Sequence, residues 1–190
     1  MIIGLAGSYP GVGQKTIVNR LRTKHGFVNS SISEPSEVIA ESFFGYDSSK
    51  KDSVIPREIR YIGNRVNINM WVYYALDFAR RRKRGLHIES MKISFLFYYN
   101  IIGIIEDIKK SGAEQYVGEE NIVLSDIRSP QEARSIVNLG GKIFLVNREM
   151  KTDSLPHNFA NDAGIFIGNT IENNGSIEDL NTIVDSIALR

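Results

Sequence analysis

The chain has 190 residues, of which 42% are hydrophobic and 24% are charged, and its formal net charge is +1. This is the composition of an ordinary globular domain, and the balanced charge argues against a general nucleic-acid coat protein, which carries a large basic excess. The absence of cysteine excludes a disulfide scaffold, a thiolate metal site and a cysteine nucleophile.

Neither apolar stretch of the chain has the features of a targeting or membrane segment. Residues 1–7 lack a basic region and a cleavage site, so we do not expect a signal peptide. Residues 93–105 are interrupted by Asn100 and Gly103 and are too short to span a bilayer. We therefore expect a cytoplasmic protein that has neither a membrane nor a nucleic acid as a partner.

Strand-like and helix-like segments alternate along the chain. The first part predicts a strand at 2–6, a helix at 14–24 and a weak strand or loop at 27–32. The middle part predicts a surface loop at 46–54 and helices at 34–44, 56–66, 71–84 and within 90–110. The last part predicts strands at 122–124, 142–146 and 165–167, and helices at 132–139 and 177–189.

This alternation predicts an α/β fold with a mainly parallel sheet and helices on both faces. No repeat, linker or low-complexity tract divides the chain, so we expect one domain over residues 1–190. Its core would come from about 1–33 and 119–190, with a helical substrate or lid region at about 34–118. The apolar 90–110 stretch is either a buried helix or one that faces a partner, such as a second copy in a homodimer.

The first strand leads into a glycine-rich turn that is typical of phosphate-binding loops. Successive backbone N–H groups in such a turn, followed by a helix N-terminus, form a concave anion site. Glycine lets the backbone approach phosphate oxygens closely, and Thr16 is placed to offer its hydroxyl to magnesium. A turn that only caps the helix is the alternative. The expected nucleotide-binding residues are Pro10, Gly11, Val12, Gly13, Gln14, Lys15 and Thr16.

The loop departs from the GxxxxGK[ST] pattern at its lysine. With Gly13 in the glycine position, Gln14 stands where lysine is expected and Lys15 follows one residue later. An ammonium near a phosphate contributes about 4 kcal/mol at an effective dielectric near 20, which is on the order of a thousandfold in rate. Three alternatives follow: Lys15 reaches back after a small shift of the loop, another cation substitutes, or the protein binds nucleotide with weak catalysis.

A second motif follows the strand predicted at 122–124. The strand leads to Asp126, which is the Walker-B arrangement of a carboxylate beside a phosphate-bound metal or its water. Arg128 comes next, on a loop where ligands bind in open α/β sheets. The structural alternatives are that Asp126 caps the helix near Pro130 and that Arg128 is a solvated surface charge.

The segment IVLSDIRSPQEARSIVNLGGKIFLVNR resembles the sDvRfpnEA…lGG.vi.v.R pattern of the phage-type deoxynucleoside monophosphate kinases, a P-loop kinase family. Two further regions resemble it: Pro56-Arg57-Glu58 with Gly63 and Trp71-Val72, and residues 171–180 near the C-terminus. The likeness covers nearly the whole chain apart from about 81–118. The residues that match the first pattern are Asp126, Arg128, Pro130, Glu132, Ala133, Gly140, Gly141 and Arg148.

The resemblance implies a P-loop NTPase-type three-layer α/β/α fold and transfer of the ATP γ-phosphoryl group to a deoxynucleoside 5′-monophosphate, with magnesium. Under it, Thr16 and Asp126 would hold the metal. The catalytic candidates are Lys15, Asp126, Arg128 and Arg148. The candidates for binding the acceptor are Arg57, Arg65, Trp71 and Arg128.

Several of these residues also have purely structural explanations. Arg57 can be a surface arginine paired with Glu58, Trp71 a core residue and Arg148 a surface residue. The basic run at 80–84 is either a solvated helix end or a source of a lid cation. Gln14, and Glu37 where the family has lysine, depart from the pattern, so a nucleotide-binding protein with weak or no kinase activity is the alternative function.

Overall fold

The computed structural model describes residues 1–7, 11–47, 54–66, 69–85, 120–149 and 169–189. A five-stranded parallel sheet with the strand order β2-β3-β1-β4-β5 forms its centre. The strands are β1 (Ile2–Gly7), β2 (Val28–Ser31), β3 (Ile122–Ile127), β4 (Lys142–Asn147) and β5 (Thr170–Glu172). The described helices are α1 (Gln14–His25), α2 (Glu34–Phe44), α3 (Val54–Val66), α4 (Met70–Lys83), α7 (Pro130–Asn138) and α8 (Ile177–Ala188).

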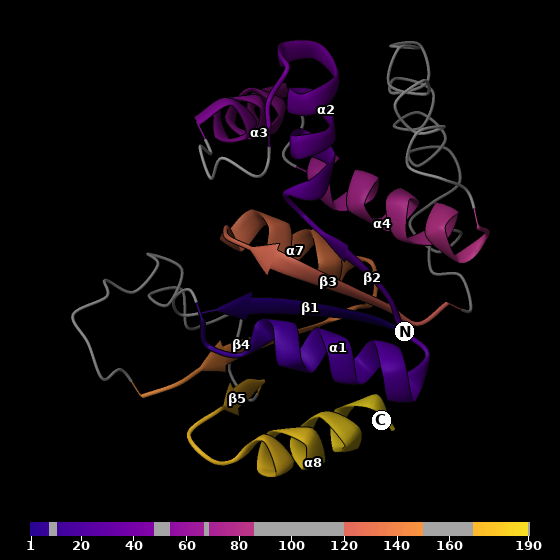
Figure 1. Cartoon of the computed structure of the whole chain (residues 1–190), viewed down its shortest axis with the longest axis vertical. Helices are drawn as coiled ribbons and strands as arrows, with labels where there is room; N and C mark the ends of the chain where they lie inside the picture. Colours follow the sequence, from indigo (N-terminus) through magenta and orange to yellow (C-terminus); the bar gives the residue numbers. More distant parts are fainter. Residues whose placement is uncertain (8–10, 48–53, 67–68, 86–119, 150–168, 190) are drawn as a thin grey trace.

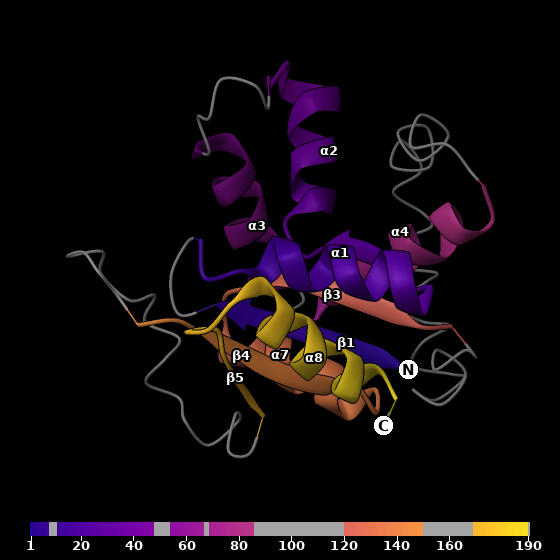
Figure 2. The same cartoon turned by 60° about the horizontal axis from the view of Figure 1, so that its bottom comes forward.

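Helices cover both faces of this sheet (Figures 1 and 2). Side chains of β1 alternate between two cores, because successive residues of a strand point to opposite faces. Ile3 and Leu5 pack with residues of α1 and α8, whereas Ile2 and Ala6 pack with residues of α4 and α7. Burial on both faces explains why β1 is a continuous apolar run. The predicted α/β class with a parallel sheet is confirmed.

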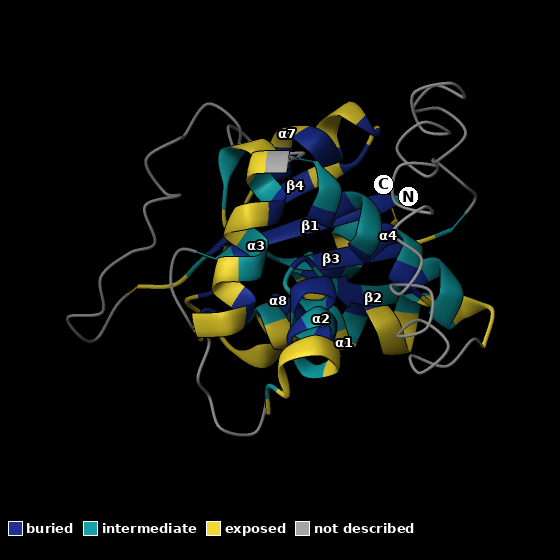
Figure 3. Ribbon diagram, turned by 90° about the horizontal axis from the view of Figure 1, so that it is seen from above, coloured by how far each residue is buried: buried dark blue, intermediate teal, exposed yellow. Residues whose placement is uncertain are grey.

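Helices α2 and α3 pack against each other and stand off the sheet, joined to it mainly through α4 (Figures 1 and 3). Gly63 allows α3 to approach α4 closely, since a Cβ atom at this position would lie 2.3 Å from Cζ2 of Trp71. Trp71 is 1% exposed, and its indole N–H donates to the carbonyl of Arg60 at 2.9 Å. The buried ring of Trp71 therefore helps to hold α3 against α4.

The basic run at the end of α4 binds carboxylates of its own chain. Arg82 donates to the carbonyl of Asn29 at 2.9 Å and pairs with both carboxylate oxygens of Glu34, which fastens α4 to β2 and α2. Burial lowers the pKa of Arg82 from its usual value. Arg81 pairs with Asp77 at 2.7 Å. Residues of the basic run thus hold α4 against its neighbours, and they also lie at its C-terminal end, where cations are favourable.

The boundaries of several elements differ from the sequence-based expectation. Helix α3 begins at Val54, inside the predicted 46–54 loop and two residues before Pro56. Strand β3 continues to Ile127 because Ser125 and Ile127 still pair with the neighbouring strands. Residues 28–31, predicted as a weak strand or loop, form a paired strand. The short β5 was not predicted, and the strand predicted at 165–167 lies outside the described residues.

Two other expectations concern the middle of the chain. The apolar 90–110 stretch, for which a buried helix or a partner-facing helix was predicted, lies outside the described residues. None of the described helices combines the length and the apolarity that crossing a bilayer requires.

Candidate functional site

The glycine loop (residues 8–16, of which 11–16 are described) joins the carboxyl end of β1 to α1. Gly11 has φ +90° and Gly13 has φ +109°, and both lie in the left-handed region that glycine adopts without strain. Among the described residues no side chain caps the start of α1, and its first turn has no acidic residue. The first N–H groups of the helix therefore remain available to an anion, at the positive end of the helix dipole.

Asn173, which follows β5, holds the glycine loop in place through a side-chain hydrogen bond. Its Nδ2 donates to the carbonyl of Val12 at 2.7 Å, and its own N–H donates to the carbonyl of Asn147 at the end of β4, also at 2.7 Å. A Cβ atom at Gly13 would lie 2.3 Å from Nδ2 of Asn173, so this contact itself requires glycine there. Sequence reasoning assigned Asn173 no role, although its segment was part of the family resemblance.

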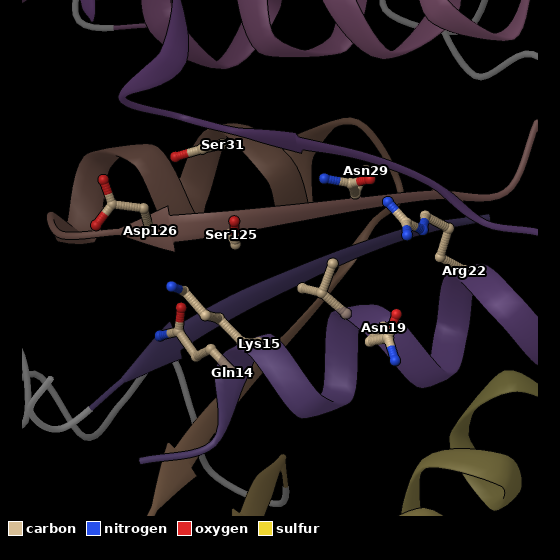
Figure 4. A pocket seen from close by; sticks show the side chains of 9 residues that line it. Gln14, Lys15, Asn19, Arg22, Asn29, Ser31, Ser125 and Asp126 are labelled. Atoms are coloured by element: carbon tan, nitrogen blue, oxygen red, sulfur yellow. The ribbon is translucent and has the colours of Figure 1, made fainter. Parts of the chain in front are cut away.

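Gln14 and Lys15 are the first two residues of α1. The Gln14 amide folds against the end of β1, since a Cβ atom at Gly7 would lie 2.5 Å from its Nε2. Lys15 is exposed, and both side chains line a pocket together with Ser125 and Asp126 (Figure 4). Both side chains thus border the pocket between α1 and β3, and the Gln14 amide also lies against the end of β1.

Asp126 adopts an unusual backbone conformation at the end of β3. Its φ is +63°, the only positive φ of a non-glycine residue in the described part of the chain. The pairing of β1 with β3 shifts here: Gly4 pairs with Leu124 but Ala6 pairs with Ile127, which leaves one extra residue on β3. Such a bulge changes the direction of a side chain, and a left-handed non-glycine residue costs on the order of 1–3 kcal/mol.

The carboxylate of Asp126 is shared by two arginines. Nε of Arg128 donates to Oδ1 at 2.6 Å, and Nη1 of Arg60 lies 3.4 Å from Oδ2. Nη2 of Arg60 also donates to the backbone carbonyl of Asp126 at 3.2 Å and to Oε1 of Glu132 at 2.6 Å. Glu132 is 1% exposed. A buried ion pair therefore supports the strained residue from the α3 side.

Glu132 uses its second oxygen to organise the loop after β3. Its Oε2 accepts from the backbone N–H groups of Arg128 at 2.9 Å and Ser129 at 3.2 Å, and Ser129 caps α7 in return. Of the two structural alternatives for this region, the first does not hold and the second holds in part. Asp126 does not cap α7, a role that Ser129 takes, and Arg128 is 58% exposed but paired with Asp126.

The acceptor residues expected on α3 and α4 do not line the pocket. Arg57 is 66% exposed and lies 3.6 Å from Glu58, which is the structural alternative foreseen for it. The Arg65 guanidinium lies 5.9 Å from the ring centroid of Tyr61. Trp71 is a core residue whose ring has almost no contact with solvent. Arg148 is exposed directly after β4, and Thr16 lies in the first turn of α1.

Arg60 is the arginine of α3 that reaches Asp126, and sequence reasoning did not select it. Pro56 and Gly63 are buried and mark the inner face of α3. Arg60 lies four residues after the first and three before the second, so helical spacing places it on that same face. The helical spacing of these residues could have identified Arg60 from the sequence, whereas the family pattern contains Arg57 instead.

A pocket of about 450 Å³ opens between α1 and the strands β2 and β3 (Figure 4). Its volume is within the range of small-molecule sites, about 300–1,000 Å³. Lys15 and Arg22 are its two cations, and most of the other residues that line it have an amide or a hydroxyl side chain. The residues around it are Gln14, Lys15, Val18, Asn19, Arg22, Asn29, Ser31, Ser125 and Asp126.

The glycine loop and Asp126 lie where the sheet topology favours ligands. From β1 the chain proceeds to β2 on one side of the sheet and, through β3, to β4 and β5 on the other. Ligands of open α/β sheets bind outside the carboxyl ends of the strands at such a switch point. Comparison with protein-family models gives no match, and comparison with curated proteins gives none either.

Proposed function

We propose that the protein is an ATP- and magnesium-dependent kinase that phosphorylates a deoxynucleoside 5′-monophosphate to the diphosphate. One observation carries the proposal: Gly11 and Gly13, both left-handed, precede an N-terminus of α1 that no described side chain caps, next to Asp126 on the strand adjacent to β1. That combination suits a bound polyphosphate. The acceptor class comes from the resemblance of the sequence to deoxynucleoside monophosphate kinases.

The glycine loop would hold the donor phosphates. Phosphoryl transfer requires mainly positioning and neutralisation of charge on the transferred group. Backbone N–H groups of residues 11–16 would supply fixed donors, and Asn173 would keep the loop in its binding conformation through the carbonyl of Val12. Preorganised donors of this kind stabilise charge without reorganising during the reaction.

Magnesium would be held by Thr16 and, through a water molecule, by Asp126. Both carboxylate oxygens of Asp126 accept from guanidinium groups, which favours an indirect contact. No group of three or more His, Asp or Glu in the described residues can form a metal site. This fits an ion bound by few protein ligands and by substrate phosphates, as is usual for magnesium. When bound, the ion neutralises charge between the phosphates.

Arginines would complete the charge compensation around the transferred group. Arg128 is on the loop after β3 and Arg148 directly follows β4, so they flank β1 on its two sides. A guanidinium can hold two phosphate oxygens at once. Arg57 and Arg65, which face solvent on α3, enter this proposal only if α3 moves toward the bound acceptor.

The second candidate is a nucleotide-binding protein with weak or no turnover. Two observations favour it: an uncharged Gln14 amide lies against the end of β1, and the carboxylate of Asp126 is already paired with two arginines. Loss of an ammonium from the transition state would cost about 4 kcal/mol at an effective dielectric near 20. The missing ammonium would therefore reduce the rate of phosphoryl transfer more than it would weaken the binding of ATP.

An assay with ATP, magnesium and each of the four deoxynucleoside monophosphates separates the candidates. ADP formation that depends on one acceptor supports the kinase, and ATP binding without turnover supports the second candidate. Thr16→Val should reduce activity, whereas Thr23→Val, which removes an exposed hydroxyl later in α1, should not. A protein that neither binds ATP nor forms ADP would overturn both proposals.

A further inference from the structure

The pocket along α1 extends well beyond the phosphate-binding end of that helix. Lys15 and Arg22 are seven residues apart, about 10 Å at the rise of an α-helix. That separation matches the length of one nucleotide, from its phosphate to the far edge of its base. The pocket also adjoins the glycine loop, since Gln14 and Lys15 belong to this loop and line the pocket.

The charges of the lining suit a small anion. Lys15 and Arg22 make no ion pair with any described residue. The one carboxylate of the pocket belongs to Asp126, and Arg60 and Arg128 already compensate it. The lining therefore carries an excess of positive charge, and the hydroxyl group of Ser125 is suited to a phosphate oxygen.

The far end of the pocket offers hydrogen bonds and an apolar surface. The backbone carbonyl of Asn19 accepts a hydrogen bond from Thr23, and that of Asn29 accepts one from Arg82. The side-chain amides of Asn19 and Asn29, in contrast, have no hydrogen-bond partner in the described part of the chain. A primary amide can donate and accept at once, which matches the paired donors and acceptors on the edge of a nucleobase. Val18 lies between the two ends and offers an apolar contact to a planar ring.

From these observations we infer that this pocket binds the nucleoside monophosphate acceptor, with its phosphate at Lys15 and Ser125 and its base at Asn19, Asn29 and Arg22. The inference rests on the proposed kinase function, and it places the acceptor along α1 instead of against α3 and Trp71. The phosphate must lie at the Lys15 end, because the donor phosphates in the glycine loop are next to that end. Asn19, Asn29 and Arg22 then determine which base is accepted.

The test measures binding and turnover separately on the full chain. Calorimetry with each of the four deoxynucleoside monophosphates, without ATP, gives the acceptor affinity, and the ADP assay gives KM and kcat. The variants are Asn19→Ala, Asn29→Ala, Arg22→Ala and Lys15→Ala. Asn138→Ala and Arg134→Ala, at exposed positions of α7, are the matched controls. Asn19 and Arg22 are exposed on α1, so their variants should fold even if a change in β2 does not.

Each base-end variant should weaken binding of the preferred acceptor about tenfold, the effect of one lost hydrogen bond. These variants should also change the ratio of affinities among the four acceptors, which a purely structural defect would not do. Lys15→Ala should weaken all four alike. KM for ATP should stay the same in the base-end variants.

The outcomes separate the inference from the proposed function. Unchanged acceptor affinities and ratios in all base-end variants, in a protein that forms ADP, overturn the inference and leave the kinase intact. Acceptor binding that depends on Asn19, Asn29 and Arg22, without ADP formation, supports the inference and overturns the kinase. A protein that binds no deoxynucleoside monophosphate overturns the inference.

Discussion

Nη2 of Arg60 on α3 lies 2.6 Å from Oε1 of Glu132 on α7, and the glutamate is 1% exposed. The same guanidinium reaches the carboxylate and the backbone carbonyl of Asp126. One arginine thus joins three parts of the molecule: the helix pair outside the sheet, the strained end of β3 and the start of α7.

Removal of Arg60 should destabilise the protein strongly. Arg60→Leu leaves the carboxylate of Glu132 buried without its partner, and breaking a buried pair on one side typically costs about 3–5 kcal/mol. Urea denaturation measures the free energy of unfolding. Arg57→Leu on the same helix is the control, and its effect should be within about 1 kcal/mol because its ion pair is exposed.

The double variant Arg60→Leu with Glu132→Leu tests the reason for this loss. Replacing both partners by apolar residues removes the unpaired charge, so the double variant should be more stable than the Arg60→Leu single variant. A double variant less stable than Arg60→Leu would show that the contacts with Asp126 or the cap of α7 dominate.

Gln14→Lys should raise kcat, by up to about a thousandfold if the ammonium acts only on the transition state. Lys15→Ala should instead raise KM for the acceptor, because its ammonium is a cation of the pocket, whereas the Gln14 amide is uncharged and lies against the end of β1. Steady-state kinetics of the two variants and of Gln14→Ala distinguish these effects. Equal loss in Lys15→Ala and Gln14→Ala would show that the displaced lysine has no separate role.

Asn173→Ala should weaken ATP binding about tenfold, since one buried hydrogen bond to the glycine loop is lost. The acceptor affinity should not change, because Asn173 does not line the pocket. Fluorescence titration with an ATP analogue gives the Kd. The neighbouring exposed residue supplies the control, Asn174→Ala, and an equal effect there would argue against a specific role of Asn173.

Asp185 on α8 makes hydrogen bonds with three side chains of α1, and the resulting stability should depend on pH. Hydrogen bonds from Arg20, Lys24 and His25 hold the pKa of the Asp185 carboxyl far below its usual value. A lowered folded pKa gives stability that is fully present above the unfolded pKa, about 3.9, and is lost as pH falls toward the folded pKa. Wild type should therefore lose Tm below about pH 4 through this group.

The substitution Asp185→Asn removes this contribution. Its Tm should be lower than that of wild type at pH 7, and the difference should shrink as the pH falls below about 4. Thermal denaturation followed by circular dichroism from pH 7 to 2 measures the difference. Glu178→Gln on the same helix, at an exposed position, is the control. A difference that stays constant over the whole range would contradict the electrostatic explanation.

Local patterns in the sequence determined the class of the fold and the place of two loops. Apolar runs at β1, β3 and β4 and helical spacing between them were sufficient to predict a parallel α/β sheet. The glycine loop and Asp126 were also found from neighbouring residues, because a strand that ends in a turn is a local feature. The three-residue β5 escaped prediction, since so short a strand has almost no periodicity.

Only the tertiary structure decided which side chains meet. Arg60 and Asp126 are 66 residues apart in the chain, and Asn173 and Val12 are 161 apart. Such contacts depend on how α3 lies across α4 and on the strand order, neither of which the periodicity of a single segment contains. The direction of the Lys15 side chain could not be predicted either, because it depends on the space between α1 and the strands β2 and β3. Periodicity specifies the faces of each element, and packing selects the partners.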